Sequence, residues 1–293
     1  MPTVSVYHNG GSGGQPGQNN GRHGKRGVVQ GWSPAVARRN LKFLWSVDHE
    51  NLTGVGYAFT LTVRDCPPSP EEWALKIKRF FETFERLESV LRVHWVIEWQ
   101  RRGVPHLHGS VYFDKPLENF EQKFISLWCY HVGFGAGFRG QSVKQIQNVV
   151  GWLQYVAKHA ARGANHYQRS SEAIPVAWQG KTGRLWGKRG DWPVAPPERF
   201  YLDGRAGDGS WFAFRRLVRA WRVSHARAAQ DWKRLRSARE ILKSSDRRKS
   251  EVRGYSEWIP PHVQKLLLFN LTTRGYVIRT ETDNVSVPAP SST

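Results

Sequence analysis

The chain has 293 residues, of which 39% are hydrophobic and 13% aromatic, so it holds enough apolar material for a folded core. Its 44 Lys and Arg outnumber its 24 Asp and Glu, and the net charge of +20 favours a polyanionic partner, most simply nucleic acid. No apolar run is long enough to cross a membrane, the N-terminal residues lack a secretory signal, and the two cysteines form no CxxC pair. These features predict a cytoplasmic protein with no membrane partner, disulfide framework or zinc finger.

The first elements in chain order are an arm and a short helix. Residues 1–30 are rich in Gly, Asn and Gln with scattered basic residues, and they predict a flexible basic arm because they offer little apolar surface to bury. The segment "SPAVARRNLKFL" then predicts a helix, with Ser33 as its N-cap and Pro34 in its first turn.

A strand, a helix and a hairpin follow. Residues 56–63 alternate as a strand does, and Ser69 with Glu72 forms an S-x-x-E capping box that opens the clearest helix of the chain. Residues 93–100 and 105–113 predict two strands joined by a short turn as a hairpin. The apolar stripe of the helix consists of Trp73, Ile77, Phe80, Phe84, Leu87 and Leu91.

The next segments complete the predicted order of strands and helices. Residues 117–131 predict a helix, "GFGAGFRGQ" a loop that could contact DNA, "SVKQIQNV" a fourth strand and "VVGWLQYVAKHAAR" a second clear helix. The order is that of an α+β, ferredoxin-like (RRM-like) split βαβ antiparallel sheet with flanking helices, over residues 54–165. We expect it to form the centre of a domain spanning residues 31–195, in which "GRLWGKRGDWP" (183–193) is a loop.

The C-terminal part is predicted to be basic and helical over residues 196–279, with a tail at 280–293. Between Arg215 and Arg253 there are 14 Lys and Arg against 4 Asp and Glu, which is half of the whole positive excess. Arg219 and Arg222, beside Trp221, suit contact with a DNA backbone. An equally good interpretation is a helical hairpin with a solvated basic face, packed on the catalytic domain through Trp211, Phe214, Leu217, Val218 and Trp221.

Two histidines in the hairpin form a candidate metal site. His106 and His108 alternate on one strand, so both face the same side of the sheet, although HxH alone is more often a pair of ordinary surface histidines. The neighbouring strand can bring Glu98 or Gln100 beside them. Two imidazoles and a carboxylate leave positions open for substrate oxygens, which suits Mg²⁺ or Mn²⁺ at a phosphate. Glu98 could instead be a solvated strand charge paired with Arg101 or Arg102 at the turn, which are otherwise candidates for phosphate contact.

A nucleophile is available on the helix that follows. Tyr155 and Lys158 are three residues apart and therefore lie about one turn from each other on the same face. A cation near a phenol stabilises the phenolate, which is the nucleophilic form. An isolated YxxK pattern is far more often an ordinary amphipathic helix.

Together these motifs resemble HUH-superfamily rolling-circle replication initiators, most closely the replication-associated proteins of single-stranded DNA bacteriophages, the filamentous phages among them, and of related plasmids. The resemblance is carried in order by "FTLT" (59–62), "EWQRRGVPHLHG" (98–109) and "YVAKH" (155–159), with weaker similarity from residue 27 to 193.

The resemblance implies roles for individual residues. His106 and His108 would be metal ligands, and Glu98 stands where relatives place a third, usually acidic, ligand. Tyr155 would be the transesterification nucleophile and Lys158 its supporting cation.

The resemblance also places Thr60 and Thr62 in a strand that lines the site and contacts DNA. Initiators with two catalytic tyrosines carry a second one at helical spacing, whereas here His159 stands one turn on and Tyr167 lies beyond Gly163. We therefore expect a single-tyrosine enzyme, with Tyr167 as the reserve nucleophile.

The implied activity is a metal-dependent, site-specific single-strand DNA endonuclease and strand transferase. It would leave a 5′-phosphotyrosine link and a free 3′-OH, act on single-stranded and origin duplex DNA, and rely on a host helicase and polymerase, since no GxxxxGK[ST] loop is present. The alternatives are a non-catalytic RRM-like module that binds single strands and an HUH transposase.

Overall fold

The structure, a computed structural model, describes residues 1–14, 30–160, 167–203, 209–243 and 254–281. It divides into two compact units, one formed by His23–Val194 and one by Met1–Arg22 together with Ala195–Thr293. None of the described helices is both long enough and apolar enough to span a membrane.

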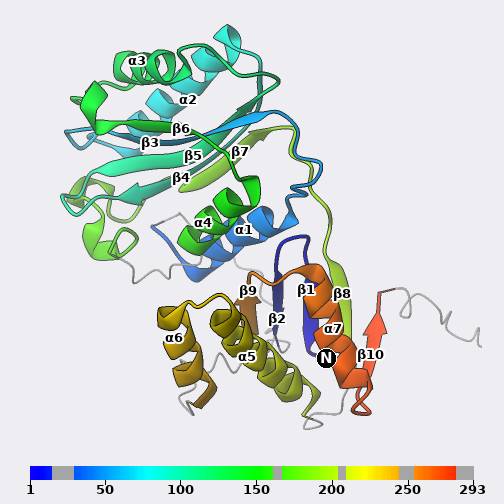
Figure 1. Cartoon of the computed structure of the whole chain (residues 1–293). Helices are drawn as coiled ribbons and strands as arrows, with labels where there is room; N and C mark the ends of the chain where they lie inside the picture. Colours follow the sequence, from blue (N-terminus) through cyan, green and yellow to red (C-terminus); the bar gives the residue numbers. More distant parts are fainter. Residues whose placement is uncertain (15–29, 161–166, 204–208, 244–253, 282–293) are drawn as a thin grey trace, which may run out of the picture. The chain divides into compact units, whose positions relative to one another are not determined.

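The first unit is a five-stranded antiparallel sheet with helices on both faces (Figure 1). The strand order is β6-β3-β5-β4-β7. Helices α2 and α3 cover one face, and α1 and α4 lie on the other (Figure 1). The elements are α1 (Pro34–Ser46), β3 (Val55–Thr62), α2 (Pro70–Leu87), β4 (Val90–Trp99), β5 (Pro105–Phe113), α3 (Phe120–Val132), β6 (Ser142–Gln145), α4 (Val149–Ala160) and β7 (Trp186–Gly190), with short 3-10 turns at Phe138–Gly140, Ser171–Ala173 and Val176–Trp178.

The α+β fold and its split βαβ order are confirmed. The sequence β3-α2-β4-β5-α3-β6 occurs with the spatial order β6-β3-β5-β4, as in a ferredoxin-like sheet. The prediction of a loop at residues 183–193 was wrong, because β7 lies there and pairs with β4 from Trp186 to Gly190. Gly190 adopts a φ of 75°, and a Cβ there would come within 2.0 Å of the Leu91 carbonyl oxygen, so glycine lets this strand approach its neighbour.

Helix starts follow the sequence signals. The Ser33 hydroxyl accepts a hydrogen bond from the Val36 amide at 3.2 Å, and Ser69 accepts one from the Glu72 amide at 3.1 Å. Of the predicted stripe on α2, the first four members are buried, whereas Leu87 is exposed at the helix end and Leu91 belongs to β4.

The main core lies between the sheet and helices α2 and α3. Aromatic rings of α2, α3 and the strands meet there edge to face, including Trp73 with Trp128 at 5.7 Å and Phe84 with Phe124 at 4.9 Å between ring centroids. Because strand residues alternate, the opposite face of β3, β4 and β5 is free to carry polar side chains. The candidate site residues lie on that opposite face.

The second unit has its own sheet and core. Its strand order is β10-β8-β1-β2-β9, and its core packs Val4 and Val6 with Trp211, Phe214 and Leu268. The elements are β1 (Thr3–Val6), β2 (Gly11–Gly14), β8 (Glu198–Asp203), α5 (Ser210–Ala228), α6 (Trp232–Lys243), β9 (Gly254–Glu257), α7 (Pro261–Thr272) and β10 (Val277–Thr280).

Two predictions for this unit need correction. Residues 3–14 are not a flexible arm, because β1 pairs with both β2 and β8 and buries its two valines. The rest of the predicted arm, residues 15–29, lies outside the described residues. The region 196–279 is not only helical, since three of its segments are strands of the same sheet. The predicted tail lies outside the described residues from 282 onward.

Candidate active site

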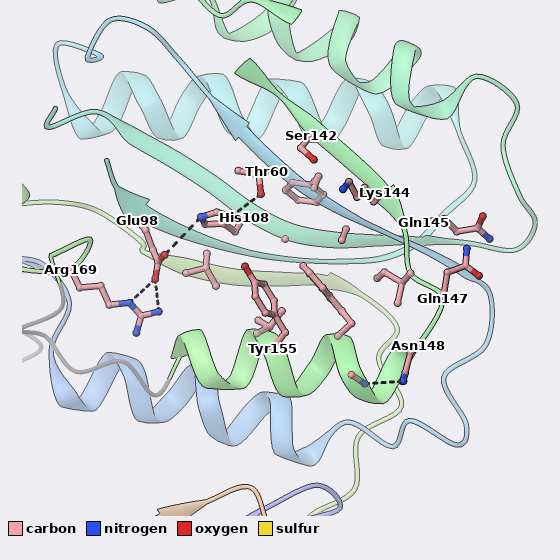
Figure 2. A pocket seen from close by; sticks show the side chains of 18 residues that line it. Thr60, Glu98, His108, Ser142, Lys144, Gln145, Gln147, Asn148, Tyr155 and Arg169 are labelled. Carbon is pink, nitrogen blue, oxygen red and sulfur yellow. Dashed lines mark hydrogen bonds and ion pairs between the residues drawn. The ribbon is translucent and has the colours of Figure 1, made fainter. Parts of the chain in front are cut away.

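The strand register brings the predicted metal ligands together. Glu98 on β4 stands directly opposite His106 on β5, and on the other side of β5 Thr62 and Thr60 stand opposite His106 and His108. The side chains of Thr60, Glu98 and His108 leave the face of the sheet toward α4 (Figure 2). Thr62 and His106, each two residues along the strand from Thr60 and His108, share that face.

The three ligand atoms are close enough for one ion. The Nε2 atoms of His106 and His108 are 2.6 Å apart, and His108 Nε2 lies 3.8 Å from Glu98 Oε2. One ligand atom from each of the three residues lies within 4.8 Å of the others. Two imidazole nitrogens and a carboxylate oxygen are a donor set for a divalent cation, so the residues present fit such an ion.

Glu98, and not Gln100, completes this set. The Gln100 side chain donates to Thr62 Oγ1 at 2.9 Å and accepts from Arg102 Nε at 2.7 Å. Its amide is therefore occupied in bracing the turn between β4 and β5. Glu98 is buried, with 1% of its side chain exposed, and it lies among the histidines.

Thr60 is hydrogen-bonded to His108 through Nδ1, the ring nitrogen that does not contact His106. Its hydroxyl lies 2.9 Å from His108 Nδ1 (Figure 2). If Nδ1 carries the proton and donates it to Thr60, the Nε2 lone pair is directed toward His106 and Glu98. A hydrogen bond to the far nitrogen of a ligating histidine commonly fixes its tautomer and ring orientation in this way.

Arg169 is a site residue that the sequence analysis missed. Its Nε and Nη2 both lie 2.7 Å from Glu98 Oε1, and its guanidinium stacks 4.0 Å from the ring centroid of Trp32. Trp32 is itself anchored by donating to the Ile97 carbonyl at 2.9 Å. Arg169 and Glu98 are 71 positions apart and share no local pattern, so only the folded chain reveals this contact.

Tyr155 shares a cleft with two of the three candidate ligands, Glu98 and His108. Both Tyr155 and His108 line a cavity of about 460 Å³, together with Glu98, Thr60 and Arg169. Tyr155 projects from α4 toward the strands that carry the ligands, is 52% exposed, and stacks on Trp152 with a centroid distance of 5.6 Å (Figure 2).

The start of α4 fixes the direction from which Tyr155 enters. The Asn148 side chain accepts a hydrogen bond from the Gly151 amide at 2.8 Å and so caps the helix (Figure 2). Lys158 lies in the same helix, but its side chain is outside the described residues.

The reserve nucleophile lies elsewhere. Tyr167 is 49% exposed, and the guanidinium of Arg101 lies 5.1 Å from the centroid of its ring. Tyr167 is not among the residues that line the cleft with His108. Arg101 is therefore paired with an aromatic ring at the hairpin turn and does not reach into the cleft.

Arg102 is largely occupied by the protein itself. Beyond its bond to Gln100, it donates to the carbonyls of Val63 at 2.6 Å and Arg64 at 3.1 Å. Two of these three bonds tie the turn after β4 to the residues that follow β3, and the third stays within the turn.

Arg219 and Arg222 lie on α5 in the other compact unit. Both are half-buried, while Arg215 of the same helix is buried. Trp211, Phe214 and Val218 are buried in the core of that unit, and Leu217 and Trp221 pack against it. The predicted packing stripe is therefore present on α5, but it packs into the core of its own unit, where packing on the catalytic domain was expected.

A second buried histidine belongs to the support of the sheet. His94 on β4 lies 2.8 Å from Asn40 Oδ1 through its Nε2. Burial, with a smaller effect of Lys188, lowers the pKa of His94 to about 3. His94 is therefore neutral and serves as a hydrogen-bonding core residue between β4 and α1.

The comparisons with known proteins agree on one family. The family model described as replication-associated protein ORF2/G2P matches residues 56–163. A protein of Xylella fastidiosa strain 9a5c named "Putative replication protein" is 50% identical over 96% of this chain and 100% of its own length. The replication-associated protein G2P of Pseudomonas phage Pf3 is 45% identical over 86% of this chain and 90% of its own. No solved structure matches. The chain therefore belongs to the replication-associated protein ORF2/G2P family.

Proposed function

We propose that this protein initiates rolling-circle replication in the cytoplasm of a bacterial host by nicking and rejoining single-stranded origin DNA. The observation that carries the proposal is that Glu98 and His108 share one cleft with Tyr155, while His106 lies against His108. An RRM-like binding module has no need for a nucleophile beside such a group of ligand side chains, so this observation favours the enzyme.

Each residue has a part in the step. The Tyr155 oxygen attacks the scissile phosphorus, the bond from phosphorus to the 3′ oxygen breaks, and the phosphate becomes a 5′-phosphotyrosine. The phenol gives up its proton to solvent or to a base, and the departing 3′ oxygen takes one to become a 3′-OH. When bound by His106, His108 and Glu98, Mg²⁺ or Mn²⁺ would withdraw negative charge from the phosphate oxygens.

The remaining parts hold this arrangement. Thr60 orients His108, and Arg169 holds one oxygen of Glu98 so that the other is directed toward the histidines. Lys158, one turn from Tyr155, is proposed to stabilise the phenolate. The 3′-OH would prime a host polymerase, a host helicase would open the duplex, and a later attack of a 3′-OH on the phosphotyrosine would close a circle.

A trapping assay tests the proposal. Purified protein is mixed with single-stranded DNA carrying the origin, in Mn²⁺ or in EDTA, and the products are separated under denaturing conditions. We expect a covalent protein–DNA adduct with the unchanged protein in Mn²⁺, and none in EDTA or with Tyr155→Phe. Tyr167→Phe and the exposed Tyr130→Phe on α3 are the matched controls and should retain it.

The other outcomes assign the function differently. An adduct that persists in Tyr155→Phe and disappears in Tyr167→Phe would move the nucleophile to Tyr167. Tight binding with neither a nick nor an adduct would support the binding module. Integration of the strand into an unrelated target would support the transposase.

The basic helices α5 and α6 are proposed to hold the origin duplex. Arg216 and Arg227 on α5, and Lys233, Arg236 and Arg239 on α6, are exposed, whereas Trp211, Phe214 and Val218 of α5 are buried in the core of their own unit. The helices thus separate a packing face from a basic face. Arg219 and Arg222, half-buried between the two, would contact the backbone through their outer N–H groups.

A further inference from the structure

We infer that the glycine-rich loop between α3 and β6 forms a subsite for one unpaired nucleotide of the DNA strand, next to the nicking cleft. A second cavity, of about 430 Å³, lies there. Its lining residues are Thr62, Val63, Arg64, Arg102, Gly135, Gly137, Phe138, Arg139, Gly140 and Gln141. The inference rests on the proposed function, because it assigns the place of the strand that is nicked.

The second cavity lies next to the first one along β3. Thr60 lines the cleft with His108 and Tyr155, whereas Thr62 lines the second cavity. Two residues along a strand span about 6–7 Å, so the two cavities adjoin along β3. Thr62 also stands opposite the ligand His106. A strand whose phosphate lies at the histidines can therefore place a neighbouring nucleotide in the second cavity.

The loop is held in shape although its sequence is rich in glycine. The Phe134 carbonyl accepts bonds from the amides of both Arg64 and Asp65, at 3.1 and 2.9 Å. The Gln141 side chain accepts from the Thr62 amide at 2.7 Å and donates to the carbonyls of Thr62 and Gly137 at 3.1 and 2.7 Å. Five bonds thus fasten the loop to the end of β3 and to itself.

Gly135 permits the close contact that this anchoring requires. It adopts a φ of 65°, and a Cβ there would lie 2.8 Å from Asp65 Oδ2 and 3.0 Å from Arg64 Nε. Glycine is suited both to this backbone conformation and to this approach. Because the loop already has its shape, it loses less conformational entropy when a ligand binds in the cavity.

The side chains that this rigid loop presents suit a nucleotide. Phe138 is 50% exposed, Arg139 is exposed, and the Arg64 side chain is 74% exposed beside them. Bases of single strands stack on such aromatic rings, and arginines bind the flanking phosphates. The pair of Arg64 with Asp65 at 3.2 Å is an exposed ion pair, which a phosphate can displace at little cost.

Binding is tested in the Tyr155→Phe protein, with EDTA, so that nothing is cleaved. The probe is a fluorescein-labelled oligothymidylate, and the affinity is measured by anisotropy at several salt concentrations. We expect Phe138→Ala to weaken binding roughly fivefold to a hundredfold with an unchanged salt dependence, and Phe138→Trp to restore it. We expect Arg139→Ala and Arg64→Ala each to reduce the slope of log K against log salt by about 0.7.

As controls, one arginine and one aromatic residue on the opposite face of the sheet are each changed to alanine. Arg79→Ala on α2 and Tyr130→Ala on α3 alter an exposed arginine and an exposed aromatic residue there. Thermal unfolding of every variant checks that the fold is kept. Loop variants that bind no more weakly than these controls would overturn the subsite.

The adduct assay, done with Tyr155 intact, separates this inference from the proposed function. Adduct formation with unaltered binding in the loop variants would overturn the subsite and leave nicking in place. Weakened binding in the loop variants, with no adduct from any protein, would leave the subsite as a binding site and overturn nicking.

Discussion

At the scale of single residues, the candidate ligand set is built on a buried ion pair. Glu98 and Arg169 are both inside the protein, with 1% and 0% of their side chains exposed, and they meet at 2.7 Å. A buried charge left without its opposite partner is costly, on the order of 3–5 kcal/mol. The same arrangement implies that a cation bound beside Glu98 could replace part of the positive charge with which Arg169 compensates this carboxylate.

Changing Arg169 should therefore destabilise the metal-free protein more than the metal-loaded one. We expect Arg169→Ala to lower the free energy of unfolding by roughly 3–5 kcal/mol in EDTA and by clearly less in saturating Mn²⁺. Urea unfolding in both conditions measures the difference. The double variant Arg169→Ala with Glu98→Gln should recover part of the loss in EDTA. An equal loss with and without Mn²⁺ would contradict a metal site at Glu98.

His94 should make stability depend on pH. Its pKa in the folded protein is about 3, below the ordinary value of 6.5, so between these values only the unfolded chain takes up the proton. Its stabilising contribution is complete above about pH 6.5 and is lost as the pH falls toward 3.

The test compares the unchanged protein with His94→Gln, which keeps a donor for Asn40 but does not titrate. Below pH 6, the free energy of unfolding of the unchanged protein should fall more steeply, by up to about 1.4 kcal/mol per pH unit. Urea unfolding at several pH values gives the two slopes. Parallel curves would mean that His94 takes up its proton over the same pH range in the folded and the unfolded protein.

At the scale of elements, the sequence signals that succeeded are local ones. The caps at Ser33 and Ser69 need only a backbone amide three residues away, and the hairpin strands β4 and β5 are joined by a short turn. The failure at β7 has a physical reason. "WGKRG" is short, polar and rich in glycine, and it is a strand only because β4 offers it an open edge.

In the candidate site, too, the parts that depend on local sequence were predictable and the part that comes from a distant segment was not. The alternation of His106 and His108 and the nearness of Glu98 depend on two adjacent strands of one hairpin, so periodicity suffices. Arg169 reaches the site from a distant segment, and its role depends on tertiary packing against Trp32. No spacing rule could have found it.

Gly109, which follows the histidine pair, should be intolerant of any side chain. A Cβ there would lie 2.2 Å from the His94 carbonyl oxygen and 2.4 Å from Phe59 Cζ. We expect Gly109→Ala to destabilise the protein by about 1–3 kcal/mol or more, measured by urea unfolding, because strand backbone and a core ring must both shift. Gly137→Ala, where a Cβ meets nothing within 4 Å, is the control and should have little effect.

At the scale of the whole molecule, the second unit was the part least accessible to sequence. Its strand β1 is only Thr3–Val6, β2 is "GSGG", and the partner β8 begins at Glu198. Composition alone favours an arm, since the apolar residues that bury Val4 and Val6 come from segments far along the chain. Strand pairing of such long range leaves no local pattern.

Two substitutions distinguish the strand from an arm. We expect Val4→Asp to destabilise this unit by roughly 4 kcal/mol or more, because it places a charge in the core, whereas Ser5→Asp on the other face should cost about 1 kcal/mol or less. Calorimetry should show the loss in one unfolding transition and leave that of residues 23–194 in place. Equal effects of the two changes would indicate that residues 3–6 are not a strand in solution.

The pairing of β1 with β8 also sets an order of events during synthesis. Val6 pairs with Glu198, and all of residues 23–194 lie between them. At about 5–20 residues per second, β1 waits on the order of ten to forty seconds for its partner to be made. The unit with the histidines and Tyr155 is a single stretch of chain that ends at Val194, before β9 and β10 of the other unit are made. A nascent chain can therefore complete its candidate nuclease before its other unit has all of its strands.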